Sequence, residues 1–165
     1  LMDFVCAYRT VTQPLSLACQ AHSIAALFSD IHTLFCAEVN DKNISLQFSC
    51  SPDHLEITTD VVQLEHALIN LIRNAIEALQ DFSAATREIR VQAYINVQGK
   101  IVIDVMDNGP GIAADKREQV FVPFFTSKPA GTGIGLFLVQ QVMHAHGGTV
   151  KYIPQPSGSC FRLVF

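Results

Sequence analysis

Apolar residues recur along the first third of the chain with two different periods. Between residues 17 and 35 they are spaced by three or four positions, which predicts one amphipathic helix, and the polar residues 40–43 should end it. Over residues 44–50 apolar and polar positions alternate, which predicts a strand with one buried face. Residues 56–59 predict a second, shorter strand.

The strongest helical pattern covers residues 61–80, and Asp60 precedes it as a suitable N-cap. One face of this helix is apolar, comprising Leu64, Leu68, Leu71, Ile72, Ala75 and Leu79. A second face is polar and carries His66, Asn70, Arg73, Asn74 and Glu77. Asn is a poor helix former, and exposed helix faces usually carry Lys and Glu, so the two asparagines indicate a function.

Two further alternating segments, residues 89–95 and 101–106, are joined by residues 97–100, which predict a hairpin turn. If the alternation continues, the next residue, Asp107, points to the same side as Ile103, towards the core. A carboxylate at the edge of a core needs a hydrogen-bond donor, because burying it without a partner is costly.

The C-terminal third predicts a helix over about 134–145, ended by residues 146–148, and two strands over 149–153 and 160–165. The apolar face of this helix should bury Leu136, Val139, Val142 and Met143. Together these elements predict an α+β fold. It is a two-layer α/β sandwich, with a mixed, mostly antiparallel sheet of about five strands and three main helices on one face.

Composition and charge narrow the function. The chain has 165 residues, 49% of them hydrophobic and 16% charged, which fits one compact domain. Its net charge of −4 provides no general attraction to nucleic acid or to anionic membranes. The five cysteines are widely spaced, so we expect reduced thiols in a cytoplasm. No apolar run is long enough to span a membrane, and no signal-peptide pattern opens the chain.

Two glycine clusters carry the candidate chemistry. The first is Asp-Asn-Gly-Pro-Gly-Ile at 107–112, and the second is Gly-Thr-Gly-Ile-Gly-Leu at 131–136. Between them, residues 121–128 contain three phenylalanines and Lys128. Glycines permit positive φ and close backbone approach, and the second cluster runs into the predicted helix at 134–145, so its free amides would suit a phosphate group.

These segments resemble four motifs of one protein family. Residues 70–75 resemble the N box, 107–112 the G1 box, 121–128 the F box and 131–136 the G2 box of the ATP-binding catalytic domain of sensor histidine kinases. That domain has the Bergerat fold, shared with type II topoisomerases, Hsp90 chaperones and MutL. The segment Asn-Ala-Ile-Glu-Ala at 74–78 is similar to the nitrogen-regulation and dicarboxylate-sensor subgroup.

The resemblance implies ATP and Mg²⁺ as cofactors. It assigns Asp107 to the exocyclic amine of adenine, Asn74 and Asn70 to the metal and to catalysis, and the three phenylalanines to a lid. The residues expected to bind the nucleotide are Asn70, Arg73, Asn74, Asp107, Gly109, Gly111, Ile112, Lys128, Gly131, Thr132, Gly133, Ile134, Gly135 and Leu136.

Each assignment has a structural alternative. Asp107 could instead cap the turn formed with the two residues after it, and Asn74 could bond a neighbouring loop. Arg73 and Lys128 could be ordinary solvated side chains. No phosphate contact is carried over to Glu77, where many kinases of this class have Lys.

Asn70 separates two kinds of chemistry. The ATP-hydrolysing members that this family resembles have at this position a Glu that activates water. Asn cannot do so, because its side chain has no useful basicity. The sequence therefore favours phosphoryl transfer to a protein nucleophile over an ATP-hydrolysing clamp, a non-catalytic nucleotide-binding module or an anti-sigma serine kinase.

The expected nucleophile is a His that lies outside this chain. A phosphoacceptor His is usually followed by Glu or Asp, and none of the six histidines is. The resemblance makes residues 1–14 the end of a dimerisation and phosphoacceptor helix with its linker, and 15–165 the catalytic domain. The implied partners are that dimerisation domain, in a homodimeric parent, and the receiver domain of a response regulator. The parent could be an inner-membrane sensor, with this domain on its cytoplasmic side.

Overall fold

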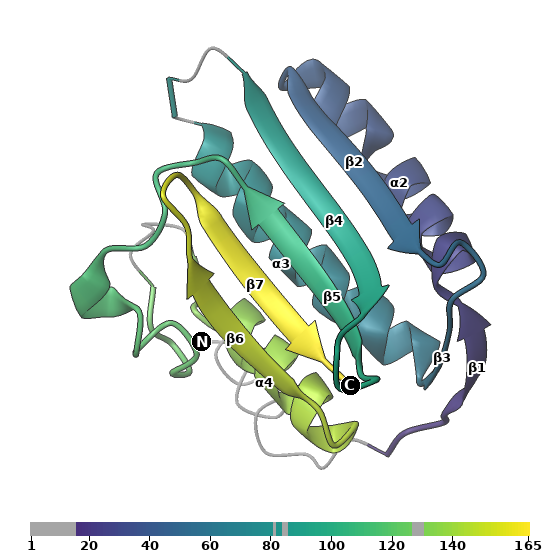
Figure 1. The fold of residues 1–165 in the computed structure, drawn as a ribbon. Coiled ribbons are helices and arrows are strands. Elements are labelled where there is room, and N and C mark those ends of the chain that lie inside the picture. The colour runs from purple at the N-terminus through teal and green to yellow at the C-terminus, as the bar shows by residue number, and fades with distance from the viewer. Residues whose placement is uncertain (1–15, 81, 84–85, 127–130) are drawn as a thin grey trace.

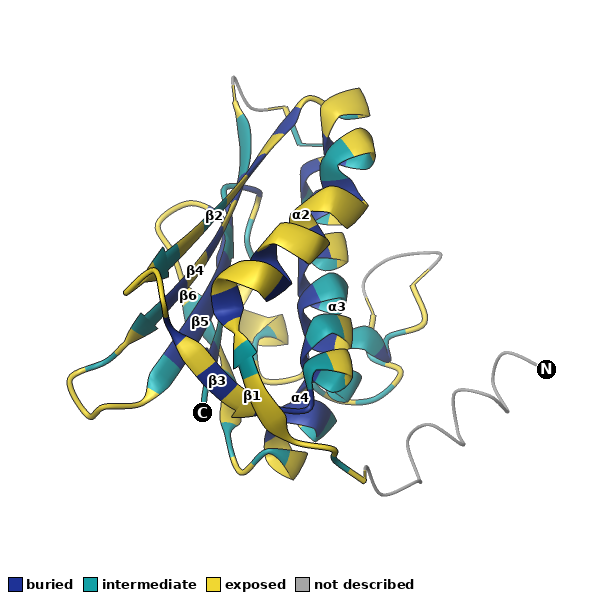
Figure 2. Ribbon diagram, turned by 90° about the vertical axis from the view of Figure 1, so that its right-hand side faces the viewer, coloured by how far each residue is buried: buried dark blue, intermediate teal, exposed yellow. Residues whose placement is uncertain are grey.

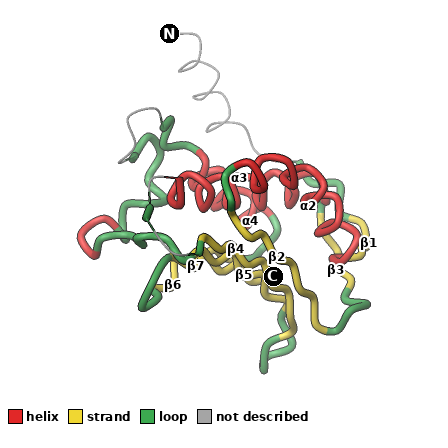
Figure 3. The backbone as a smooth tube through the Cα atoms, turned by 90° about the horizontal axis from the view of Figure 1, so that it is seen from above, coloured by secondary structure: helices red, strands yellow, loops and turns green. Residues whose placement is uncertain are grey.

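Within the residues that the computed structural model describes (16–80, 82–83, 86–126 and 131–165), three α-helices lie on one face of a five-stranded sheet (Figures 1 and 3). The elements in chain order are β1 (Gln20–Ser23), α2 (Ile24–Asp41), β2 (Ile44–Ser51), β3 (Glu56–Thr59), α3 (Val61–Gln80), β4 (Arg87–Ile95), β5 (Ile101–Asp107), the 3₁₀ turn η1 (Ala114–Lys116), α4 (Gly135–Ala145), β6 (Thr149–Pro154) and β7 (Ser159–Val164).

The five-stranded sheet has the order β2-β4-β5-β7-β6. β2 and β4 are parallel, and the other three pairs are antiparallel. The predicted two-layer fold with a mixed, mostly antiparallel sheet is therefore confirmed. None of the described helices combines the length and apolar character that crossing a membrane requires.

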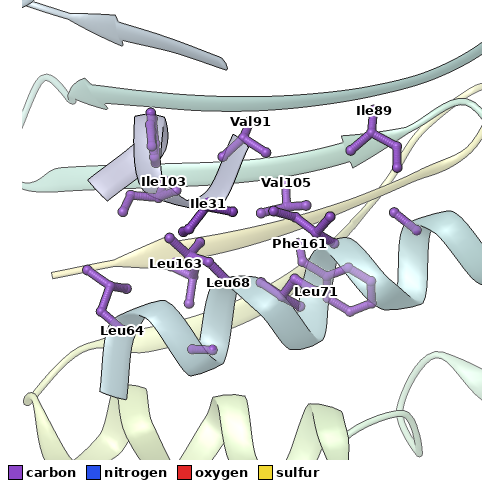
Figure 4. Packing of buried hydrophobic residues seen from close by; sticks show 14 of the residues in the cluster. Ile31, Leu64, Leu68, Leu71, Ile89, Val91, Ile103, Val105, Phe161 and Leu163 are labelled. Carbon is purple, nitrogen blue, oxygen red and sulfur yellow. The ribbon is translucent and has the colours of Figure 1, made fainter. Parts of the chain in front are cut away.

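The core lies between α3 and the sheet (Figure 4). Leu64, Leu68 and Leu71 of α3 are at most 1% exposed, and they point towards the sheet. Facing them are buried residues of β4, β5 and β7, namely Ile89, Val91, Ile103, Val105, Phe161 and Leu163. The bounds predicted for α3 are confirmed, and Oδ1 of Asp60 accepts a hydrogen bond from the Gln63 amide at 3.2 Å, as an N-cap does.

The helix predicted from residue 17 is wrong at its start, because α2 begins at Ile24. Ser23 caps the helix by accepting a hydrogen bond from the Ala26 amide at 3.3 Å. The residues before it form β1, which pairs with β3 in a separate two-stranded sheet. The apolar spacing continued into β1 by coincidence, and a strand pairing with a distant segment leaves no trace in local periodicity.

One further prediction, about the buried face of α4, needs correction. Leu136 is only half-buried, whereas Val139, Val142 and Met143 are buried as expected. On β5, the face turned away from the helices is also buried: Val102 is 2% exposed and Asp104 is 4% exposed.

No described helix covers that face of the sheet (Figure 2), so neighbouring side chains bury Asp104. Arg162 on β7 donates two hydrogen bonds to its carboxylate, each at 2.8 Å, and the Tyr94 hydroxyl on β4 donates a third at 3.2 Å. A bidentate pair with an added hydroxyl satisfies the buried charge.

Candidate functional site

Asn70 and the start of α4 face each other. The Nδ2 group of Asn70 donates to the His66 carbonyl at 3.0 Å, one turn earlier on α3. Its Oδ1 points the other way: a Cβ added to Gly135 would lie 3.0 Å from it. The structure therefore brings the predicted N box and G2 box together, with a side-chain oxygen of one against the backbone of the other.

Asp107, at the end of β5, lies beside the C-terminal end of the same helix. A Cβ added to Gly109 would lie 2.8 Å from Asp107 Oδ1 and 3.4 Å from Leu79 Cδ2, so the G1 loop packs beside the last turn of α3. Asn70 and Leu79 are separated by about 13 Å of helix. Asn74 lies between these two ends, and among the described residues its side chain makes no hydrogen bond.

The carboxylate of Asp107 is buried, with only 9% of the residue exposed, as the alternation of β5 predicted. Its Oδ1 accepts a hydrogen bond from the Gly109 amide at 2.9 Å. The turn-capping role considered as an alternative is therefore present. It also holds the carboxylate in one orientation at the end of β5.

Four residues with no predicted role hold the G1 loop, Asn108 and Gly158 at its start and Tyr152 and Arg117 at its far end. Asn108 accepts from the Glu88 amide and donates to the Thr86 carbonyl, both at 2.8 Å, which ties the loop to the start of β4. Gly158, at φ +87°, leaves no room for a Cβ beside the Asp107 carbonyl oxygen. Its position in a Pro-Ser-Gly-Ser turn was the only sequence signal for it.

Tyr152 and Arg117 fix the far end of the same loop. The Tyr152 hydroxyl accepts from the Ile112 amide at 3.2 Å, and Arg117 Nε donates to the Ile112 carbonyl at 2.9 Å. The Arg117 guanidinium lies 5.8 Å from the Tyr152 ring centroid. The contacts of Tyr152 join segments far apart in the sequence, so periodicity and spacing could not predict them.

The segment after the G1 loop is held at two points. The Phe121 ring packs edge-on against Phe161 of the core, with centroids 6.2 Å apart. Phe124, at φ +65° and 41% exposed, donates its amide to the Gly133 carbonyl at 2.9 Å. Gly133 is also at positive φ, and a Cβ there would meet the Phe124 backbone at 2.5 Å. Lys128 lies outside the described residues.

α4 begins without a side-chain cap. Ile134 occupies the N-cap position, and no acidic residue lies in the first turn. The first-turn amides and the positive end of the helix dipole therefore point towards the loop formed by Gly131, Thr132 and Gly133, which suits an anion.

Arg73 lies on another side of α3. Its guanidinium lies 5.8 Å from the ring centroid of Phe35 on α2, whereas Asn70 faces α4. The structure therefore brings Asn70, Gly135 and the start of α4 together, and places Arg73 against α2. The predicted contact of Arg73 with phosphate stays a prediction.

Comparison with known proteins adds the family. Residues 59–165 match the family described as "Histidine kinase-, DNA gyrase B-, and HSP90-like ATPase". The chain is 39% identical over 119 residues to the C4-dicarboxylate transport sensor protein DctB of Rhizobium meliloti, covering 72% of this chain and 19% of DctB. It is 36% identical over 154 residues to the sensor histidine kinase ZraS of Escherichia coli, covering 93% of this chain and 32% of ZraS.

Two solved structures show the same architecture. The catalytic domain of histidine kinase ThkA superposes with a TM-score of 0.77 at 26% identity, covering 92% of this chain and 95% of that one. Full-length ShkA in complex with AMPPNP superposes with a TM-score of 0.83 at 25% identity, covering 98% of this chain and 34% of that one.

The chain spans about a fifth to a third of the two curated relatives, so it corresponds to one part of such proteins. The predicted likeness to dicarboxylate sensors is confirmed by the match to DctB. The chain belongs to the histidine kinase-, DNA gyrase B- and HSP90-like ATPase family, and within it to the catalytic ATP-binding domains of sensor histidine kinases.

Proposed function

We propose that this domain binds ATP with Mg²⁺ along the polar face of α3 and transfers the γ-phosphoryl group to a His on a separate dimerisation domain. The observation that carries the proposal is the arrangement of two dissimilar ends on one helix. A buried carboxylate lies beside Leu79, and an uncapped helix N-terminus lies beside Asn70. A nucleotide has the matching asymmetry, with a hydrogen-bonding base at one end and phosphates at the other.

At the base end, Asp107 would accept a hydrogen bond from the exocyclic amine of adenine. Guanine presents a carbonyl at that position, so a carboxylate selects adenine. The Gly109 amide, bonded to Oδ1, fixes the direction in which the carboxylate faces. Gly111 and Ile112 continue the loop, and the hydrogen bond from the Ile112 amide to the Tyr152 hydroxyl would hold it in place beside the base.

At the phosphate end, Asn70 and Asn74 fit a Mg²⁺ ion held mainly by phosphate oxygens. The side-chain oxygens of both asparagines are neutral, so the phosphates would supply the charged ligands. The hydrogen bond of Asn70 Nδ2 to His66 leaves its Oδ1 directed at the start of α4. When bound, Mg²⁺ supplies charge neutralisation on the phosphates. The amides of residues 131–136, with Lys128, would hold the phosphate oxygens.

Asn70 also decides between transfer and hydrolysis. Its amide cannot take a proton from water, so the bound ATP would persist until another nucleophile is presented. What this chain contributes to transfer is then the position of the γ-phosphoryl group relative to an incoming imidazole. An ATP-hydrolysing clamp is the alternative. Phosphate release by the chain alone, at a rate that a His-bearing partner does not change, would favour it.

The nucleophile and the next acceptor belong to other domains in this proposal. His146 is unsuited as an acceptor, because both of its ring nitrogens have hydrogen-bond partners. A dimerisation domain of the same parent protein would present the acceptor His, and a response regulator would receive the phosphoryl group on Asp. Such a parent would be a homodimer with this domain in the cytoplasm.

Asp107→Asn tests the proposal by isothermal titration with ATP and Mg²⁺. The Asn side chain can still accept the Gly109 amide, so the turn and the fold should persist. The Nδ2 group of the new Asn is then expected to face the adenine amine, and two donors cannot form a hydrogen bond. The affinity for ATP should fall by about 10- to 100-fold, which corresponds to the loss of one charge-assisted hydrogen bond of about 1.5–3 kcal/mol. Asp115→Asn, on the exposed η1 turn, is the control. Equal affinity of Asp107→Asn and the parent chain would refute the adenine role.

A further inference from the structure

Asp60 joins the N-terminal part of the described chain to α3. Its Oδ2 accepts a hydrogen bond from the Ala18 amide at 2.9 Å, and its Oδ1 accepts from the Gln63 amide at 3.2 Å. One carboxylate therefore caps the helix that carries Asn70 and also holds the segment that leads into β1. These hydrogen bonds lower the pKa of Asp60, so its carboxylate is ionised at neutral pH.

His146 joins the same point to the C-terminal end of α4. The Asp60 amide lies 3.1 Å from His146 Nε2, and the Thr59 hydroxyl lies 2.9 Å from it. A backbone amide can only donate, so Nε2 is the acceptor. His146 Nδ1 therefore carries the hydrogen and donates to the Val142 carbonyl at 2.7 Å. One tautomer satisfies every contact, which makes the ring a bridge between β3 and α4.

Three segments thus meet at one junction, as Figures 1 and 2 show: the chain leading into β1, the start of α3 and the end of α4. The other end of α4 is Gly135, about 16 Å away along the helix. Asn70 lies about 15 Å from Asp60 along α3. One end of each helix is therefore hydrogen-bonded at the junction. The residues proposed to bind the phosphates and the metal lie further along each helix.

The junction is unsuited to chemistry of its own. Both nitrogens of His146 and both carboxylate oxygens of Asp60 already have partners within the domain. His146 therefore offers no free nitrogen lone pair to a metal ion or a proton, and the Asp60 carboxylate is engaged by the Ala18 and Gln63 amides. The remaining property of the junction is mechanical, because a change in the segment at Ala18 would reach α3 and α4 through hydrogen bonds.

We propose that Asp60 and His146 are positioning residues that couple the segment leading into β1 to the phosphate-binding end of the nucleotide site. The coupling rests on the proposed function, because its output is the placement of Asn70 and of the α4 N-terminus. A shift of the incoming segment would then alter the binding of Mg²⁺-ATP without any contact with the nucleotide.

Two variants at the junction separate coupling from helix capping. Asp60→Ser keeps a good N-cap for α3, but its single, shorter oxygen cannot also hold the Ala18 amide. Ala18→Pro removes the donor from the other side, and Ala18→Gly is the control that retains it. Ala18 is exposed, so these changes leave the core intact. Hydrogen exchange across α4 and the affinity for Mg²⁺-ATP are measured in each.

Coupling predicts that Asp60→Ser and Ala18→Pro each speed exchange in α4 and weaken Mg²⁺-ATP binding by about fivefold, the lower end of usual coupling strengths. The double variant should be no worse than either single one, because both remove the same hydrogen bond. Unchanged exchange in α4 in a folded Ala18→Pro chain would overturn the proposal. The exchange measurement needs no nucleotide, so it gives its result even if the chain fails to bind ATP.

Substitutions of His146 test whether its hydrogen bonds or its bulk matter. The ring packs edge-on against Phe165, with centroids 6.1 Å apart. His146→Phe keeps a ring there and loses the hydrogen bonds to Asp60, Thr59 and Val142. His146→Gln loses the ring but can still accept the Asp60 amide. Coupling predicts that Gln preserves Mg²⁺-ATP affinity and slow exchange in α4 better than Phe, and the reverse order would assign His146 a packing role and overturn the proposal.

Discussion

Gly135→Ala should separate the stability of the domain from its affinity for metal-bound nucleotide. Gly135 is the first residue of α4, and its φ lies outside the left-handed region, so Ala can adopt its backbone conformation. Replacing Gly by Ala at such a position stabilises by about 0.4–1 kcal/mol, through the lower entropy of the unfolded chain. The added Cβ, however, would lie 3.0 Å from Asn70 Oδ1.

The Asn70 amide must therefore move by a few tenths of an ångström. Its bond to the His66 carbonyl is a neutral one, worth about 1 kcal/mol, so weakening it roughly offsets the backbone gain. We expect the free energy of unfolding in urea to change by less than about 0.5 kcal/mol. A Mg²⁺ ligand is less forgiving, because the ion requires near-octahedral geometry. Affinity for Mg²⁺-ATP should fall by about tenfold, or about 1.4 kcal/mol.

The assay is titration with ATP in the presence of Mg²⁺ and, separately, of a chelator. If the Cβ acts through Asn70, the loss should appear only with Mg²⁺, and Gly135→Ala should have no further effect in an Asn70→Ala background. An equal loss with the chelator would mean that the methyl group blocks the phosphates directly. Unchanged Mg²⁺-ATP affinity in the single variant would refute the placement of Asn70 at the metal.

Two further predictions concern the fold around the site. Gly158→Ala should destabilise the domain by about 2–5 kcal/mol, because positive φ costs about 1–2 kcal/mol and overpacking against the Asp107 carbonyl adds about 1–3 kcal/mol. Gly99→Ala is the control, because Gly99 has φ +76° and a Cβ added to it would have no neighbouring atom within 4 Å. In urea unfolding it should lose only the stability that the positive φ costs, and equal losses in the two variants would contradict the steric argument. Burial raises the pKa of the Cys160 thiol from 9.0 to about 11, so the folded state binds more protons than the unfolded state between these values. Stability should therefore fall as pH rises from about 9 to about 11, less steeply in Cys160→Ala, and identical pH profiles would contradict it.

The sequence predicted the elements that local periodicity determines. Residues 61–80 have the bounds of α3, and the alternating segments became strands with ends shifted by a few residues. The sequence did not predict β1, because that strand forms by pairing with β3, about 36 positions further along the chain. The apolar residues of β1 also have the spacing of the helix that follows. Tertiary pairing overrode a local pattern there.

The site was predicted only as far as its motifs extend. Asn70, Asp107 and the glycines lie in short segments whose residue types are unusual for their elements, so they were visible. Gly158 and Tyr152 act on the G1 loop from the hairpin of β6 and β7, and Asn108 acts on β4 through its side chain. Their contribution lies in long-range contacts, which a single sequence does not reveal.

The two ends of the proposed site are held by different parts of the fold, and this has a consequence for regulation. Asp107 lies in β5, between β4 and β7, and its turn is tied to both neighbours, so the base end can move only with the sheet. The phosphate end depends on α4 and on the segment that the Phe124 amide joins to the Gly133 carbonyl. α4 is in turn tied to Asp60 through His146. A signal arriving along the chain would therefore alter the geometry of the phosphates while adenine stays in place, so the affinity for Mg²⁺-ATP and the readiness to transfer the phosphoryl group would change together.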